Sequence, residues 1–228
     1  ETLQILLYTT TQMRLRLLTF LIPFLIFSQE NLTKIRFWNN IEFLHSSSKY
    51  DRFSFELSSR FINDESDYSN FIFDLSYSKK HNKNISFTIG VRNSHENFNL
   101  SSDLRNRIYF DLNTRSVVDK NNIIKTRVRY QSQVKNQFFL FDDLAKPTRK
   151  FRYKIVFEKR YKGFPRIYSF FEPFYEIGFG FEKYRIGLGL KFDIFDKHSF
   201  NLSFMSQKHI DDISSNFVAV RTKLSFSL

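Results

Sequence analysis

The sequence predicts an all-β fold, an antiparallel up-and-down transmembrane β-barrel of 10 to 12 strands. Apolar residues recur at every second position through most of the chain, which is typical of strands. Many alternating segments are longer than the average globular strand and reach the roughly 9 to 11 residues that a tilted membrane strand needs. Phe occurs 30 times in 228 residues and aromatic residues make up 18%, which suits a wall that faces lipid.

The first 28 residues are predicted to lie outside the folded barrel. Residues 13–28 combine Arg14 and Arg16 with an apolar run and a small final residue, which is the order found in a secretory signal peptide. The apolar run is too short to cross a bilayer as a helix. Residues 1–12 lie upstream of this signal, which begins at Met13, and they do not themselves begin with Met. We therefore expect them to be a non-native or read-through upstream segment. Residues 29–228 should form a barrel exported to the bacterial outer membrane.

The first half of the barrel region contains six alternating segments. Their apolar positions fall within Ile35–Phe43, Phe53–Phe61, Phe71–Tyr77, Ile85–Val91, Leu104–Leu112 and Ile124–Tyr130. Charged or polar residues occupy the positions between them, as expected for a strand with one apolar face. Short connections at 79–82 and 118–121, which are mostly polar, separate neighbouring segments and predict tight turns.

The second half contains five more alternating segments. Their apolar positions fall within Phe151–Phe157, Ile167–Ile177, Tyr184–Phe192, Phe200–Phe204 and Val218–Leu228. Longer connections are expected at 93–103, 133–148 and 208–216. Eleven is an odd count, whereas bacterial single-chain barrels usually have an even number of strands. Either the segment 35–44 lies outside the wall or one long segment is split, and the expected range is therefore 10 to 12.

Alternation alone does not say which face of the sheet points inward. The export signal and the many charges on the polar face favour an apolar face turned toward lipid. The side chains predicted to face lipid are Phe55, Phe73, Phe87, Ile108, Val128, Ile155, Leu188 and Phe226. The charged side chains predicted to face the lumen are Arg105, Arg107, Arg127, Arg129, Arg152, Lys154, Glu172 and Arg185. Because acidic and basic residues are interleaved, we favour a salt-bridged plug over a weakly anion-selective pore.

The last segment is expected to close the barrel. Val218, Val220, Leu224, Phe226 and Leu228 share one face of the alternation. An open edge in hydrocarbon would leave backbone groups unpaired, so this strand should pair with the first strand of the wall. The expected partners are outer-membrane lipid and, during biogenesis, the barrel-assembly machinery, with the folded protein a monomer.

Other classes of function find little support. The formal net charge is +12, but Lys and Arg are spread along the chain rather than clustered on one face, so no nucleic-acid partner is expected. The chain has no cysteine, which excludes a disulfide framework or a zinc–thiolate site. His45 and His198 each precede a serine, but neighbours in a strand point to opposite faces. We therefore predict no catalytic residue, no metal site and no cofactor.

Several motifs, taken in order, resemble a family of envelope barrels known as domain-of-unknown-function 2490, common in Bacteroidota-type bacteria. The residues that carry the resemblance are Phe37-Trp38, Arg52–Phe61, Asn106–Leu112, Arg127–Gln131, Phe181–Leu190 and Lys197–Leu202. The resemblance covers about residues 29–228. It implies an outer-membrane barrel and no known enzymatic activity or ligand.

The sequence leaves three hypotheses for function. The leading one is an outer-membrane barrel with a structural role or a role in passive transport of small solutes, and not an enzyme. The second is an outer-membrane lipid-modifying hydrolase, which would need a Ser–His–acid contact in the fold. The third is a soluble periplasmic lipocalin-like binder of an apolar ligand, which would need the apolar face to point inward.

Overall fold

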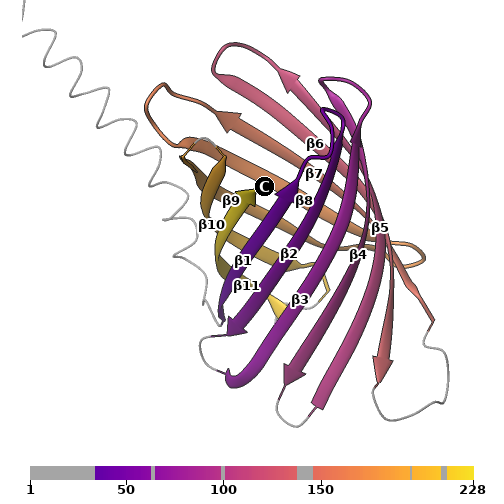
Figure 1. Ribbon diagram of the computed structural model, residues 1–228. Helices are drawn as coiled ribbons and strands as arrows, with labels where there is room; N and C mark the ends of the chain where they lie inside the picture. The colour runs from indigo at the N-terminus through magenta and orange to yellow at the C-terminus, as the bar shows by residue number, and fades with distance from the viewer. Residues whose placement is uncertain (1–33, 63–64, 99–100, 138–145, 196, 212–214) are drawn as a thin grey trace, which may run out of the picture. The chain divides into compact units, whose positions relative to one another are not determined.

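The computed structural model describes residues 34–62, 65–98, 101–137, 146–195, 197–211 and 215–228, which form a closed β-barrel (Figure 1). The predicted upstream segment 1–12 and signal peptide 13–28 lie outside the described residues. In the described part of the chain, no helix is long and apolar enough to cross a membrane. The strands are β1 (Ile35–His45), β2 (Asp51–Ile62), β3 (Glu65–Lys80), β4 (Ile85–Phe98), β5 (Ser101–Val117), β6 (Asn122–Gln137), β7 (Thr148–Lys159), β8 (Arg166–Glu176), β9 (Gly180–Ile194), β10 (His198–His209) and β11 (Phe217–Ser227).

The barrel closes through a parallel seam between its first and last strands. Each strand from β1 to β10 pairs antiparallel with the strand that follows it. The seam between β11 and β1 is parallel and runs from Ile35 opposite Val218 to Leu44 opposite Ser227. The predicted all-β barrel of 10 to 12 strands is confirmed, with eleven, but the prediction of a wholly antiparallel wall is wrong at the seam. In a meander with an odd number of strands, the first and last strands necessarily point the same way.

The first segment, whose place the sequence left open, is part of the wall. β1 has hydrogen-bonded neighbours on both sides, β2 and β11. The ring of Phe43 stacks on Phe226 of β11 at a centroid distance of 5.6 Å and lies 6.4 Å from Phe55 of β2. Aromatic pairs of this kind add to the stability gained from buried area. Side chains as well as the backbone ladder therefore hold the seam that β11 closes.

Three connections are shorter than the sequence predicts. The loop expected at 93–103 is mostly strand, because β4 continues to Phe98 and β5 begins at Ser101. The loops expected at 133–148 and 208–216 are likewise shortened by longer β6 and β10 strands. The end of β4 carries polar residues on both faces. The apolar alternation that predicts a strand is therefore lost there, although backbone pairing continues.

The two ends of the barrel are named here the turn end and the loop end. Odd-numbered strands finish at the turn end, and even-numbered strands begin there. At this end Ser48, Asn82 and Asp119 each accept hydrogen bonds from backbone N–H groups two and three residues further along the chain. Turns of this kind fix the chain locally. Hydrogen bonds from the side chain of Asn122 and from the N–H groups of Asn121 and Asn122 hold the pKa of Asp119 below its usual range.

The outer face of the wall carries the eight side chains predicted to face lipid. Four of them are exposed, namely Phe73, Phe87, Ile108 and Val128. The other four are half-buried, namely Phe55, Ile155, Leu188 and Phe226. Phe55 and Phe226 both pack against the ring of Phe43, and this contact covers part of each of them.

Candidate functional site in the barrel lumen

The inner face of the wall gathers the charged side chains of the barrel. The eight residues predicted to face the lumen all lie there: Arg105, Arg107, Arg127, Arg129, Arg152, Lys154, Glu172 and Arg185. They come from β5 to β9, which are consecutive in the wall. Arg129, Arg152 and Glu172 are buried, and the other five are half-buried. Buried charges persist when they are paired or hydrogen-bonded, so the pairing pattern decides what the lumen can do.

Glu172 is the centre of the first ion network. Its Oε1 atom lies 2.5 Å from Nη2 of Arg127 and 2.8 Å from Nη2 of Arg152. Its Oε2 atom lies 3.9 Å from Nη1 of Arg185. Three guanidinium groups, from β6, β7 and β9, thus converge on one carboxylate from β8. Glu172 is only 3% exposed, and removing its charge would leave these cations facing one another.

A second network crosses the strands from β3 to β6. Arg129 donates from Nε to Oδ1 of Asp111 at 2.6 Å and from Nη2 to Oδ2 at 2.7 Å, a two-pronged geometry of high specificity. The guanidinium carbon of Arg129 lies 3.7 Å from the ring centre of Tyr109. The hydroxyl of Tyr109 donates to Asp74 at 2.6 Å, and Asp74 also accepts from Arg92 at 2.6 Å.

Together these networks form a layer across the middle of the lumen. We call it the midbarrel belt and define it by Asp74, Tyr109, Asp111, Arg129, Arg152 and Glu172. All six residues are buried. Their positions near the middle of long strands place them between the two ends of the barrel. Spaces toward the turn end and toward the loop end lie on either side of the belt.

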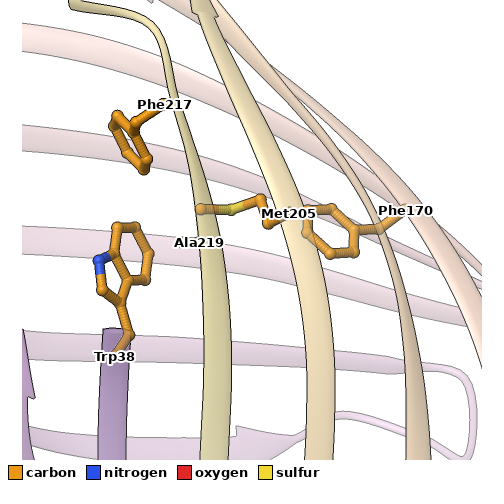
Figure 2. Packing of buried hydrophobic residues seen from close by; sticks show 5 residues of the cluster. All are labelled: Trp38, Phe170, Met205, Phe217 and Ala219. Atoms are coloured by element: carbon orange, nitrogen blue, oxygen red, sulfur yellow. The ribbon is translucent and has the colours of Figure 1, made fainter. Parts of the chain in front are cut away.

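Apolar side chains fill the side of the lumen that β1 and β8 to β11 enclose. The cluster consists of Trp38, Phe170, Met205, Phe217 and Ala219 (Figure 2). Cations lie over its rings, with Arg60 4.1 Å from the ring centre of Trp38 and Lys154 4.1 Å from that of Phe170. Such contacts stabilise a charge that has lost part of its hydration. At the turn end, space remains on the side of the barrel built from β2 to β7.

Glycines on the inner face make room for aromatic rings. A Cβ atom at Gly90 would lie 2.3 Å from the ring of Tyr109 on the next strand, and one at Gly187 would lie 2.6 Å from the ring of Phe170. Real Cβ atoms do not approach so closely, so each ring occupies the place of the missing side chain. Glycine is required at both positions because an aromatic ring of a neighbouring strand lies against its backbone.

Space remains on both sides of the midbarrel belt. At the turn end there is a cavity of about 1060 Å³, adjoined by a pocket of about 270 Å³ that reaches Asp111. Toward the loop end there is a cavity of about 240 Å³ lined in part by Arg152. The turn-end space exists because the inner faces of β3 and β4 carry small residues there, such as Ser78, Ser86 and Thr88.

The turn-end cavity, called here the basic vestibule, is strongly cationic. Nine of its lining residues are Lys or Arg: Lys49, Arg52, Lys80, Lys83, Arg115, Lys125, Arg127, Lys154 and Arg160. No Asp or Glu of the described residues lines it. The loop-end cavity is also cationic, with eight Lys or Arg side chains in its lining, but there one carboxylate, Glu182, lies within the lining and binds Lys150 and Lys183 at 2.6 Å.

The serine-flanked histidines lie at the ends of their strands. His45 is exposed at the end of β1. The ring of His198 packs against Phe226 on the outer face, with a centroid distance of 5.4 Å. Among the residues with described positions, no group of three or more His, Asp or Glu side chains is arranged to hold a metal ion.

The apolar alternation does not reveal the large inner residues that shape the lumen. Trp38 and Tyr109 occupy polar positions in the alternation, where they face inward and are 3% exposed. Gly90 and Gly187 stand at the same kind of position. An aromatic residue on the polar face of one strand and a glycine on that face of the next strand is a signal that could have predicted this packing.

One comparison with known proteins gives a match. A family model described as "Protein of unknown function (DUF2490)" matches residues 35–216, from the first residue of β1 to the residue before β11. No curated protein and no solved structure matches the chain.

Proposed function

The chain belongs to the family of proteins of unknown function DUF2490, and we propose that it is an outer-membrane β-barrel with a passive role in the passage of small solutes. It would be embedded in outer-membrane lipid after export and insertion by the barrel-assembly machinery. The family itself suggests no reaction, so the proposal depends on the two faces of the barrel wall.

The observation that carries this proposal is the continuous apolar outer face. Every strand contributes an exposed large apolar side chain to it, in wall order Phe37, Phe53, Phe73, Ile89, Ile108, Val128, Tyr153, Phe171, Ile186, Phe204 and Leu224. Phe73 and Ile108 are 52% and 53% exposed. Soluble monomers rarely expose an apolar surface that runs right around the molecule, because water disfavours it. A lipid environment would bury these side chains.

The soluble alternative requires the opposite arrangement. A lipocalin-like binder would hold an apolar ligand against an apolar inner face. Here the inner face carries the midbarrel belt and the basic vestibule, whose charges an apolar ligand would have to desolvate. The lumen is therefore suited to water and polar solutes.

A passive role follows from the filling of the lumen. The midbarrel belt is buried and joined by salt bridges, so it restricts passage between the two ends of the barrel. One chain closes its own wall, so a monomer is sufficient. We expect slow passage limited to small solutes, with most of the resistance at the belt.

Membrane insertion is tested by washing the envelope fraction of expressing cells with alkaline carbonate. We expect the full chain to stay in the membrane pellet and to show heat-modifiable mobility on gels, as folded barrels do. Release of folded protein into the wash would contradict membrane insertion.

Passage is tested by swelling of liposomes that contain the purified protein. Tyr109→Ala removes the ring that lies across Gly90 in the belt, and it should speed the entry of small neutral sugars. Tyr153→Ala, at an exposed position on the outer face, is the matched control and should leave the rate unchanged. Equal swelling rates for the wild type, Tyr109→Ala and Tyr153→Ala would contradict a passage limited by the belt, whatever the result of the carbonate wash.

A further inference from the structure

We propose that the basic vestibule is a binding site for small organic polyanions, molecules that carry two or more phosphate or carboxylate groups. The inference rests on the proposed function, because it names the class of solute that the lumen would accept from the turn end. It depends on four features of the vestibule: its uncompensated charge, its like-charged strand neighbours, its neutral donors and its size.

The first feature is positive charge without matching carboxylates. Within the described residues, Arg52, Lys80 and Lys154 line the vestibule and have no carboxylate within salt-bridge distance. Glu158 serves two other lining cations, Lys125 at 2.5 Å and Arg160 at 2.7 Å. A cavity with so many cations and low-dielectric walls concentrates anions.

The second feature is the placing of like charges opposite each other in the sheet. Arg115 of β5 pairs in register with Lys125 of β6, and Arg127 of β6 pairs with Lys154 of β7. All four side chains line the vestibule. Like charges directly opposite each other destabilise a sheet. An anion between them would turn this repulsion into attraction.

The third feature is a row of neutral hydrogen-bonding groups between the cations. The register places Lys80, Ser86, Asn113, Arg127 and Lys154 side by side on five consecutive strands, β3 to β7. Cations stand at both ends of the row, and small polar side chains lie within it. An anionic group could bind at each end, with the hydroxyl groups of a sugar-like body bound between them.

The fourth feature is size. A volume of about 1060 Å³ is that of a site for a whole organic molecule and is far larger than one inorganic anion requires. The lining also offers arginines, which bind phosphate and carboxylate in two-pronged fashion. A phosphorylated or carboxylated sugar or organic acid fits both the charge and the volume.

The test is isothermal titration calorimetry on the full chain, folded in detergent and checked by heat-modifiable mobility. The probes are fructose 1,6-bisphosphate, citrate and the uncharged sugar sucrose. We expect saturable binding of one or both anions, weakened by added salt, and no binding of sucrose. The relative affinity of the bisphosphate and citrate distinguishes a phosphate preference from a carboxylate preference. Absence of saturable binding of both anions would overturn the proposal.

Matched variants separate the vestibule from general surface charge. Lys80→Gln/Lys154→Gln removes two inward lysines, and Lys79→Gln/Lys159→Gln removes two outward lysines from the same strands. The inward double variant should bind the anion roughly tenfold more weakly or worse, and the outward double variant should bind it about as well as wild type. If the inward double variant does not fold, Lys80→Gln alone is compared with Lys79→Gln. Equal losses in the inward and outward variants would overturn the proposal.

The outcome is independent of the proposed membrane location. Titration uses the folded protein in detergent, whereas insertion is judged by carbonate extraction. A barrel that stays in the membrane but binds no anion would overturn the vestibule proposal alone.

Discussion

Replacing Glu172 by glutamine removes one negative charge from the centre of the lumen with almost no change in shape. The carboxylate contacts guanidinium groups of Arg127, Arg152 and Arg185, at 2.5, 2.8 and 3.9 Å. The amide can accept a hydrogen bond but cannot compensate three positive charges. The variant therefore isolates the electrostatic contribution of this carboxylate from its packing.

The expected cost is large because the site is buried. Breaking a buried ion pair by removing one partner costs about 3–5 kcal/mol. The side chain of Arg152 is 8% exposed, but that of Arg127 is 24% exposed and can regain some hydration. We therefore expect Glu172→Gln to lower the free energy of unfolding by about 3 kcal/mol, the lower end of that range.

The measurement is equilibrium unfolding of the folded protein in lipid vesicles by guanidinium chloride. The chain contains a single tryptophan, and Trp38 is buried in the lumen cluster, so its fluorescence reports on barrel opening. The control is Asp193→Asn, whose side chain is 63% exposed and pairs with Arg166. That exposed pair should contribute about 0–1 kcal/mol. A Glu172→Gln protein within 1 kcal/mol of wild type would refute the reasoning and show that water screens the belt.

Three further predictions concern the outer face, an inner glycine and the seam. Phe73→Arg should destabilise the protein in lipid by roughly 2–4 kcal/mol, whereas Val118→Arg beside a turn should cost about 0–1 kcal/mol. Equal losses for the two variants, measured by unfolding in vesicles, would contradict a lipid-facing band. Gly187→Ala should cost about 1–3 kcal/mol by overpacking. Its Cβ would lie 2.6 Å from a backbone carbonyl oxygen as well as from a ring, and an unchanged unfolding midpoint would contradict that packing. Phe226→Asp should cost roughly 0–4 kcal/mol, depending on depth, and should lower the yield of heat-modifiable barrel more than Ser227→Asp does. Equal yields for these two variants would contradict a stabilising role for the aromatic stack on the outer face of the seam.

Much of the wall could be predicted because strand geometry is local. The side chains of a strand alternate between faces with period two, so Phe73 and Ile108 could be assigned to one face, and Arg107 to the other, without knowledge of any partner. Strand ends were less predictable. In β4 the apolar alternation ends at Val91, but backbone pairing continues to Phe98, and nothing in the alternation marks where it stops.

The interior could not be predicted in the same way, because it depends on which strands face each other and in what register. Glu172 and Arg127 are 45 residues apart, and Lys223 binds Glu56 across a separation of 167 residues at 2.5 Å. The sequence places each of these side chains on the inner face but says nothing about which pairs meet. The turn-end space likewise arises where small residues of neighbouring strands, such as Ser78 and Thr88, lie opposite each other on the inner face, a property of strand register in the closed barrel.

The eleven-stranded wall also has a consequence for sidedness. Lys34 precedes β1 at the loop end, whereas β11 finishes beside Leu228 at the turn end. A wall with an even number of strands would bring both of its ends back to the same rim. If this barrel spans a bilayer, the two ends of its wall face different compartments, so a label attached at residue 34 and one attached at residue 228 would be accessible from opposite sides of the membrane.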